Sequence, residues 1–259
     1  MMPPRLLNHL ITRYMNHYST IEKMRQMRMS TMADLYNRSL TENLYREYSS
    51  DELLTFLVDS EWESRNNKTI DNLIRQANFR QSVSPTDIDY HSPRKLDRSV
   101  FEKLLGLGFI KNRENIIITG ATGCGKSYLA QCLGIKACQF RQRTLYYNTA
   151  RLFDAVRLAK LEGTYHSLIK KLERTPLLIL DDFGLAPMDN QARHALMDIM
   201  EDRYEKNSTI IASQIPVEKW HETIGDNSIA DAVLDRLVYS SHRIELEGDS
   251  MRKKKKLDV

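Results

Sequence analysis

The middle of the chain holds a glycine-rich segment between an apolar run and a helical pattern, NIIITGATGCGKSYLA at positions 115–130. Its Gly120, Gly125, Lys126 and Ser127 fit the phosphate-binding loop pattern G-x-x-x-x-G-K-S/T. Glycines let backbone N–H groups converge on phosphate oxygens, and the start of the following helix adds unpaired donors. A strand pattern before the loop and a helix pattern after it argue against an ordinary flexible turn. The segment therefore predicts a nucleoside triphosphate site.

Two side chains of this loop are expected to act on the phosphates and their metal ion. We expect Lys126 to neutralise the β- and γ-phosphates and the Ser127 hydroxyl to be a Mg²⁺ ligand. ATP and Mg²⁺ are therefore the predicted cofactors. The residues expected to contact the nucleotide are those of the loop and the one after it: Gly120, Ala121, Thr122, Gly123, Cys124, Gly125, Lys126, Ser127 and Tyr128.

A second apolar run, at 177–180, ends in Asp181 and Asp182. Downstream of a phosphate-binding loop, this pattern predicts a strand of the Walker B type. We expect Asp181 to hold Mg²⁺ through its water shell and Asp182 to orient or polarise the attacking water. The second acid is Asp rather than the longer Glu usual in ATPases of this type, so slow intrinsic hydrolysis is predicted.

Strand patterns alternate with helix patterns in this part of the chain. Apolar or β-branched runs predict strands at 116–118, 144–148, 177–180 and 209–212. Helices are predicted at 97–107, 150–160, 166–172, 190–204 and 229–239. The alternation predicts an α/β fold with a parallel sheet flanked by helices.

Ligands of parallel sheets bind at the carboxyl ends of the strands, so the loop, the two acids and Ser213 should meet at one edge. Ser213 ends the strand predicted at 209–212, and Gln214 follows it. Either side chain could contact the γ-phosphate or the water. A polar residue that ends a buried strand is equally compatible with a simple cap.

Glycine placement divides the chain. All ten glycines lie at or after Gly106, and glycine-free sequence rich in Leu, Met, Arg and Glu favours helix. We predict a helical N-terminal domain at 1–81, in which Trp62 lies in the core or packs against other helices rather than serving as a base-stacking platform. The segment SVSPTDIDYHSP opens a predicted linker at 82–96. The α/β domain is expected at 97–259, with a basic C-terminal tail.

Charge makes an anionic polymer a possible partner. The net charge is +4, and the first helices carry several cations but only one acid, Glu22. The candidate contacts to DNA phosphates are Arg5, Arg13, Lys23, Arg25 and Arg28. A solvated basic face is an equally good interpretation of the same residues.

Other features exclude some classes of protein. Nothing in the sequence approaches the run of about 20 apolar residues that a membrane span needs, so no membrane partner is expected. The three cysteines are odd in number and lack metal-ligand spacing, which predicts reduced thiols in the cytoplasm.

Two arginines near the C-terminus are candidates for contacts with phosphate. Arg236 lies in IADAVLDRLVY, and Arg252 lies in GDSMRKKKK. An arginine donated to the nucleotide of a neighbouring subunit couples hydrolysis to assembly. Arg236 could instead pair with Asp231 or Asp235 on its own helix, and the tail could be solvated or contact DNA.

Taken together, LLILDDFG at 177–184, STIIASQIP at 208–216, DRL at 235–237 and SMR at 250–252 resemble the IstB-like transposition helper proteins. These are AAA+ ATPases related to the DnaC-type helicase loaders. The resemblance implies an AAA+ P-loop NTPase fold after a small all-helical domain. By motif it also implies that Ser213 is sensor 1, Arg236 the arginine finger and Arg252 sensor 2.

The same resemblance implies a function and partners. Such proteins form homo-oligomers on double-stranded DNA with ATP sites between subunits, bend the DNA, and recruit and stimulate a partner transposase in the bacterial cytoplasm. The loop GATGCGKS departs from the proline-containing form ending in Thr that is frequent in the family. Since Ser also binds Mg²⁺, this departure leaves the nucleotide site intact.

Three other functions are compatible with a phosphate-binding loop, and each makes a different demand on the sequence or on the substrate. A replicative helicase loader of the DnaC type would act on single-stranded DNA. A nucleotide kinase would need an arginine-rich lid, and none lies between the loop and the second acidic run. A degenerate ATP-binding scaffold is disfavoured by the intact Lys126, Ser127 and Asp181.

Overall fold

The computed structural model describes residues 17–42, 48–248 and 250–251. The chain divides into two compact units, one up to Thr69 and one from Ile70 onward. This division falls inside the long helix α3 (Ser50–Ala77). The domain boundary expected near residue 81, with a linker at 82–96, stays a prediction.

The N-terminal unit is helical where the structure describes it. Residues 17–26 form a helix, which is followed by α2 (Ser30–Thr41) and the first part of α3. The buried Glu61 carboxylate accepts a hydrogen bond from the Met32 N–H at 3.0 Å, which joins α3 to α2. Trp62 is 61 % exposed, so the prediction that it packs against other helices was wrong.

The C-terminal unit is built on a five-stranded parallel sheet with the order β2-β3-β4-β1-β5. Its strands are β1 (Asn115–Gly120), β2 (Thr144–Asn148), β3 (Leu177–Phe183), β4 (Ser208–Ser213) and β5 (Ser241–Leu246). The predicted α/β class is confirmed. The sequence does not predict β5, whose only apolar residues are Ile244 and Leu246. This strand is defined by its pairing with β1 along its whole length.

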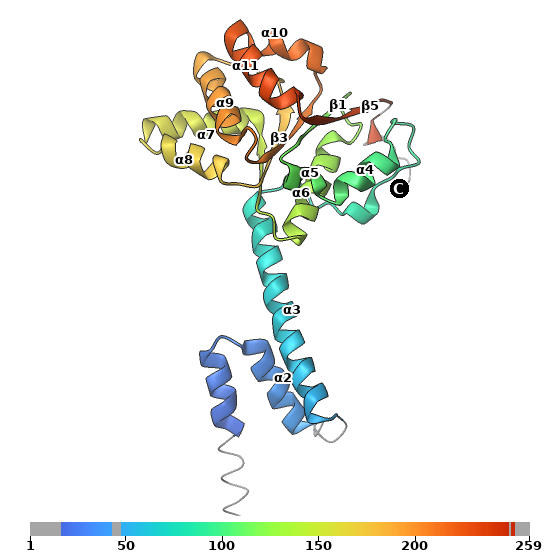
Figure 1. Cartoon of the computed structure of the whole chain (residues 1–259), viewed down its shortest axis with the longest axis vertical. Helices are drawn as coiled ribbons and strands as arrows, with labels where there is room; N and C mark the ends of the chain where they lie inside the picture. Colours follow the sequence, from blue (N-terminus) through green and yellow to red (C-terminus); the bar gives the residue numbers. More distant parts are fainter. Residues whose placement is uncertain (1–16, 43–47, 249, 252–259) are drawn as a thin grey trace, which may run out of the picture. The chain divides into compact units, whose positions relative to one another are not determined.

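Helices cover both faces of this sheet (Figure 1). Ile116 and Ile118 of β1 pack in one core with α4, α5 and α6, whereas Ile117 packs in the other with α7 to α11. This alternation is the two-residue period of a strand buried on both faces. The helices are α4 (Arg98–Leu105), α5 (Gly108–Asn112), α6 (Lys126–Gln139), α7 (Thr149–Leu161), α8 (Tyr165–Glu173), α9 (Asn190–Arg203), α10 (Trp220–Ile224) and α11 (Asn227–Val238). Within the described residues, no helix is long and apolar enough to cross a membrane.

A buried arginine holds the amino-terminal edge of the sheet together. Arg203, at the end of α9, is 2 % exposed. Its guanidinium donates to the Thr209 hydroxyl at 3.0 Å and to the carbonyls of Leu172, Thr175 and Ser208. Burial lowers the pKa of this guanidinium. Because the partners are neutral oxygens on α8, β4 and the turn before β3, the planar fork of Arg203 fixes these elements by geometry.

We expect Arg203→Lys to destabilise the protein, because an ammonium group cannot satisfy acceptors that lie in several directions. The loss should be about 2–4 kcal/mol of unfolding free energy, measured by urea denaturation. The matched control is Arg151→Lys at an exposed position on α7. Equal stability of the two variants would contradict the structural role of Arg203.

Candidate nucleotide-binding site

The predicted phosphate-binding residues meet at the carboxyl edge of the sheet. β1 runs into the loop at Gly120, and α6 begins at Lys126. The strand register sets Thr119 beside Ser213 and Asn148 beside Asp181. The carboxyl ends of β1, β2, β3 and β4 therefore lie side by side at this edge.

The loop needs its glycines. Gly120 has φ +142°, and a Cβ there would lie 2.2 Å from the Leu246 carbonyl oxygen. Gly125 has φ +101°, and its Cβ would lie 2.5 Å from Nη1 of Arg94. Both the backbone conformation and the close packing of β5 and Arg94 therefore exclude larger residues.

Lys126 and Cys124 both contact the inside of the loop. The Lys126 ammonium donates to the Ala121 carbonyl at 2.8 Å, and the side chain is buried. Cys124 is fully buried, and its Sγ donates to the same carbonyl at 2.9 Å. The lysine is thus held across the loop where phosphate oxygens are expected, whereas Cys124 fills space beneath it.

Asp181 joins the loop to β3. It is 1 % exposed, and its Oδ1 accepts hydrogen bonds from the Ser127 hydroxyl and the Asp182 N–H, each at 2.9 Å. Its Oδ2 accepts from the Tyr146 hydroxyl at 2.6 Å. A hydroxyl and a carboxylate in contact are hard oxygen donors of the kind Mg²⁺ prefers, so Ser127 and Asp181 fit the predicted metal site.

Sequence reasoning missed Tyr146. Burial and the hydrogen bond to Asp181 raise the pKa of Tyr146, so the phenol stays protonated at neutral pH and donates a hydrogen bond to the carboxylate. The predicted strand at 144–148 contains two tyrosines, and the hydrogen bond in the structure shows that Tyr146 is the one that reaches Asp181.

Asp182 lies at the more open side of the site, with a side chain 24 % exposed and a left-handed backbone at φ +56°. Its Oδ2 accepts from Nδ2 of Asn148 at 2.9 Å, and Nη1 of Arg80 lies 3.7 Å from the same oxygen. Sequence reasoning missed both partners, because neither position carries a nucleotide-binding pattern: Asn148 ends a predicted strand and Arg80 precedes the predicted linker. The Asn148 side chain also caps α7 by accepting the Arg151 N–H.

The structure separates the roles of Ser213 and Gln214. Ser213 is fully buried, where its hydroxyl donates to the Phe183 carbonyl at 2.8 Å and accepts from the Ile215 N–H. Gln214 instead accepts a hydrogen bond from the hydroxyl of Thr122 in the loop. Ser213 therefore caps the strand here, and Gln214 is the residue in contact with the loop.

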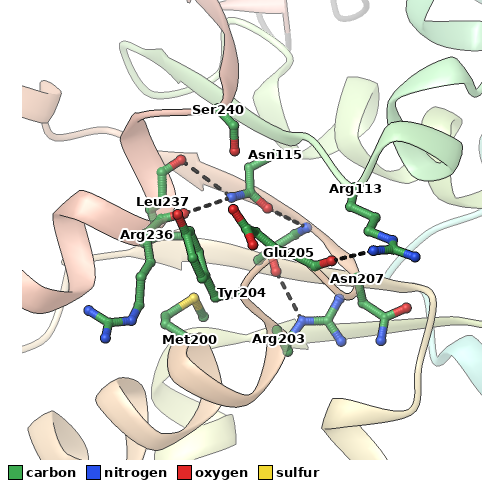
Figure 2. A pocket seen from close by; sticks show the side chains of 11 residues that line it. Arg113, Asn115, Met200, Arg203, Tyr204, Glu205, Asn207, Arg236, Leu237 and Ser240 are labelled. Atoms are coloured by element: carbon green, nitrogen blue, oxygen red, sulfur yellow. Dashed lines mark hydrogen bonds between the residues drawn. The ribbon is translucent and has the colours of Figure 1, made fainter.

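Arg236 lies beside Asn115, in the pocket that Figure 2 shows. Its carbonyl accepts a hydrogen bond from Nδ2 of Asn115, the first residue of β1, at 3.2 Å. At about 3.3 Å per residue, β1 separates Asn115 from Gly120 by roughly 17 Å. The guanidinium forms an ion pair with Glu201 and donates to the Ala232 carbonyl. Arg236 is therefore remote from the phosphate-binding loop of its own chain.

The remaining predicted residues are only partly described. Arg5, Arg13 and Arg252 lie outside the described residues. The N–H of Met251 donates to the Gly123 carbonyl at 2.9 Å, so the chain reaches the loop just before position 252. In the N-terminal unit, Lys23 and Arg28 are exposed. Arg25 forms ion pairs with Glu22 and Asp34, at 3.1 and 3.2 Å.

A further missed residue is Arg94, which is 4 % exposed beside the loop. It donates through Nη1 to the Cys124 carbonyl at 3.3 Å and through Nη2 to the Asp89 carbonyl at 2.7 Å. Its Nε has no hydrogen-bond partner among the described residues. Burial lowers the pKa of this guanidinium. Arg94 therefore sets a buried positive charge against the predicted phosphate site.

Comparison with known proteins is consistent with this geometry. The family described as IstB-like ATP binding protein matches the chain over residues 22–259. The chain belongs to the IstB-like family. It is 43 % identical over 236 residues to the insertion sequence ATP-binding protein y4pL of Sinorhizobium fredii, covering 91 % of this chain and 96 % of that protein.

More distant relatives agree with this assignment. The IstB-like chain is 32 % identical over 211 residues to the ATP-binding protein of insertion sequence IS21 from Pseudomonas aeruginosa, covering 82 % and 80 % of the two chains. The solved structure of DnaI matches with a TM-score of 0.55 at 18 % identity, over 68 % of this chain and 93 % of DnaI. This last likeness concerns the fold, which is that of an AAA+ P-loop NTPase.

The geometry of Asp182 leads to a prediction about catalysis. We expect Asp182→Asn to lower ATP hydrolysis about 100-fold or more, because the amide cannot accept a proton from water. Affinity for a fluorescent ATP analogue should stay close to that of the wild type, since Asp181 and the loop are unchanged. The control is Asp154→Asn, at an exposed position on α7. Loss of nucleotide binding in Asp182→Asn would contradict this assignment.

Proposed function

We propose that this protein is an ATP-dependent DNA-binding regulator of transposition. In this proposal it oligomerises on double-stranded DNA, bends the target and recruits and stimulates a partner transposase. The observation that supports it most is the contact of Ser127 with Asp181 at 2.9 Å, in a chain whose relatives are ATP-binding proteins of insertion sequences.

The reaction we propose is slow hydrolysis of ATP to ADP and phosphate. Lys126 binds the β- and γ-phosphates, and Ser127 with Asp181 holds Mg²⁺, which would neutralise phosphate charge when bound. Asp182 orients the attacking water and accepts its proton. We assign the polar contact near the γ-phosphate to Gln214 in place of Ser213, because Gln214 is the residue that contacts the loop.

Hydrolysis depends on assembly in this proposal. Since Arg236 lies at the amino edge of its own sheet, it acts as an arginine finger on the nucleotide of a neighbouring subunit. Its ion pair with Glu201 must open for this contact to form. The free protomer therefore hydrolyses ATP more slowly than the oligomer. This agrees with the slow intrinsic hydrolysis expected from Asp182, whose side chain is shorter than that of the usual Glu.

Exposed cations of the N-terminal unit are the proposed DNA contacts. Lys23 and Arg28 are exposed, whereas Arg25 is partly neutralised by its two acidic partners. Arg5, Arg13 and the basic tail that begins at Arg252 complete the proposed set. The three cysteines are unpaired and buried, which fits the reducing bacterial cytoplasm proposed as the location.

A DNA-binding assay tests this function directly. We expect the protein to bind random-sequence duplex DNA more tightly than single strands, only with ATP, and with an affinity that falls steeply with salt because many phosphates are neutralised. Fluorescence anisotropy across a salt series measures this. Preference for single strands would favour a DnaC-type helicase loader instead. No binding in any nucleotide state would contradict both functions.

A complementation experiment tests the shared ATP site. Lys126→Ala lacks the proposed phosphate contact but keeps the proposed arginine finger, Arg236. Arg236→Ala keeps the phosphate contact and lacks the arginine finger. Each variant alone should hydrolyse ATP at least about tenfold more slowly than the wild type on DNA, and a mixture should recover part of the rate. The control is Arg113→Ala: Arg113 and Arg236 line one pocket, and the Arg113 guanidinium donates to the Glu205 carbonyl (Figure 2). A mixture as inactive as its components would contradict a site shared between subunits.

A further inference from the structure

Residues 78–81, which follow α3, lie against the nucleotide site; we call them the junction. The Phe79 ring occupies space that only a glycine at position 134 leaves open, since a Cβ there would lie 2.7 Å from Phe79 Cε1. The ring centroid also lies 6.3 Å from that of Tyr146, the partner of Asp181. The junction is therefore packed between α6 and β2.

A buried glutamine of α6 holds the backbone of the junction. Gln131 is fully buried, and its Oε1 accepts the N–H groups of Arg80 at 2.9 Å and Gln81 at 3.2 Å. Its Nε2 donates to the Ser127 carbonyl at 2.9 Å. One buried side chain thus connects the junction to the residue expected to bind Mg²⁺, and breaking it would leave buried polar groups unsatisfied.

The side chain of Arg80 extends from this fixed backbone to Asp182. Its Nη1 lies 3.7 Å from Oδ2, the same oxygen that accepts from Asn148 at 2.9 Å. The Arg80 side chain is 61 % exposed, so an isolated pair of this kind would be weak. Here the backbone of Arg80 is already held by Gln131, which lowers the entropy lost when the pair forms.

We propose that Arg80 is a positioning residue that restrains the Asp182 carboxylate and so slows hydrolysis. The inference rests on the proposed function of Asp182 in orienting water. An oxygen that already accepts from Asn148 and faces the Arg80 guanidinium is less available to a water molecule. Release of Arg80 frees one side of this oxygen while the phosphate-binding loop keeps its geometry.

The position of Arg80 in the chain allows the N-terminal unit to regulate this restraint on Asp182. Asn148 belongs to the sheet, whereas Arg80 follows α3, whose first part lies in the N-terminal unit. DNA bound to the N-terminal unit can therefore act on Asp182 through the junction. In this mechanism, part of any stimulation of hydrolysis by DNA comes from displacement of Arg80.

The test compares Arg80→Ala and Arg80→Lys with the control Arg98→Ala, an exposed arginine on α4 that pairs with Glu102. Steady-state hydrolysis, affinity for a non-hydrolysable ATP analogue and melting temperature are measured for the full chain. We expect Arg80→Ala to raise kcat about two- to fivefold, with KM and analogue affinity unchanged within about twofold. Stimulation by duplex DNA should shrink by the same factor. Arg80→Lys, which keeps the charge, and Arg98→Ala should match the wild type.

Asp182→Asn in the same assay separates the two proposals. If it is inactive while Arg80→Ala matches the wild type, the restraint is overturned and the role of Asp182 stands. A lower kcat in Arg80→Ala also overturns the restraint, because Arg80 would then assist the reaction. A change in analogue affinity alone would assign Arg80 to binding. If Asp182→Asn hydrolyses ATP normally, the proposed function of Asp182 fails first.

Discussion

The buried carboxylate of Asp181 is the interaction on which this site depends. A charge that is 1 % exposed requires donors, and it receives them from Ser127, Tyr146 and the next backbone N–H. These donors come from the first turn of α6, from β2 and from β3 itself. The carboxylate therefore holds the sequence-distant motifs of the candidate nucleotide site in one arrangement, and it does so only if the strands are in register.

The carboxyl and amino edges of the sheet hold different groups of residues. The carboxyl edge collects the phosphate-binding loop and the acids. The amino edge is held by Arg203 and by Asn115, whose side chain also contacts the Arg236 carbonyl. Because β1 spans the sheet between these edges, a single chain carries the nucleotide site on one edge and the candidate arginine finger on the other. This separation is the physical reason to expect that hydrolysis requires a second subunit.

The junction adds a connection that runs outside the sheet. Gln131 ties it to α6, and Phe79 packs it beside Tyr146, so Arg80 approaches Asp182 from a fixed backbone. The residues predicted to bind Mg²⁺, to orient water and to receive a signal from the N-terminal unit thus form one hydrogen-bonded and packed group. Arg94 contributes a further buried positive charge next to the same loop.

The sequence by itself determined the phosphate-binding loop, the two acids near the end of β3 and the parallel α/β class. Each of these depends on local spacing: glycines where the backbone needs positive φ, apolar runs where strands are buried, and acids at a strand end. It did not determine β5, which carries few apolar residues and is defined by pairing with β1. Nor did it show that Gln214 contacts the loop while Ser213 is buried, or find Tyr146, Asn148 and Arg80. Only the tertiary structure shows these contacts, because contact between residues distant in sequence depends on strand register and on the packing of the junction against α6, which no local pattern records.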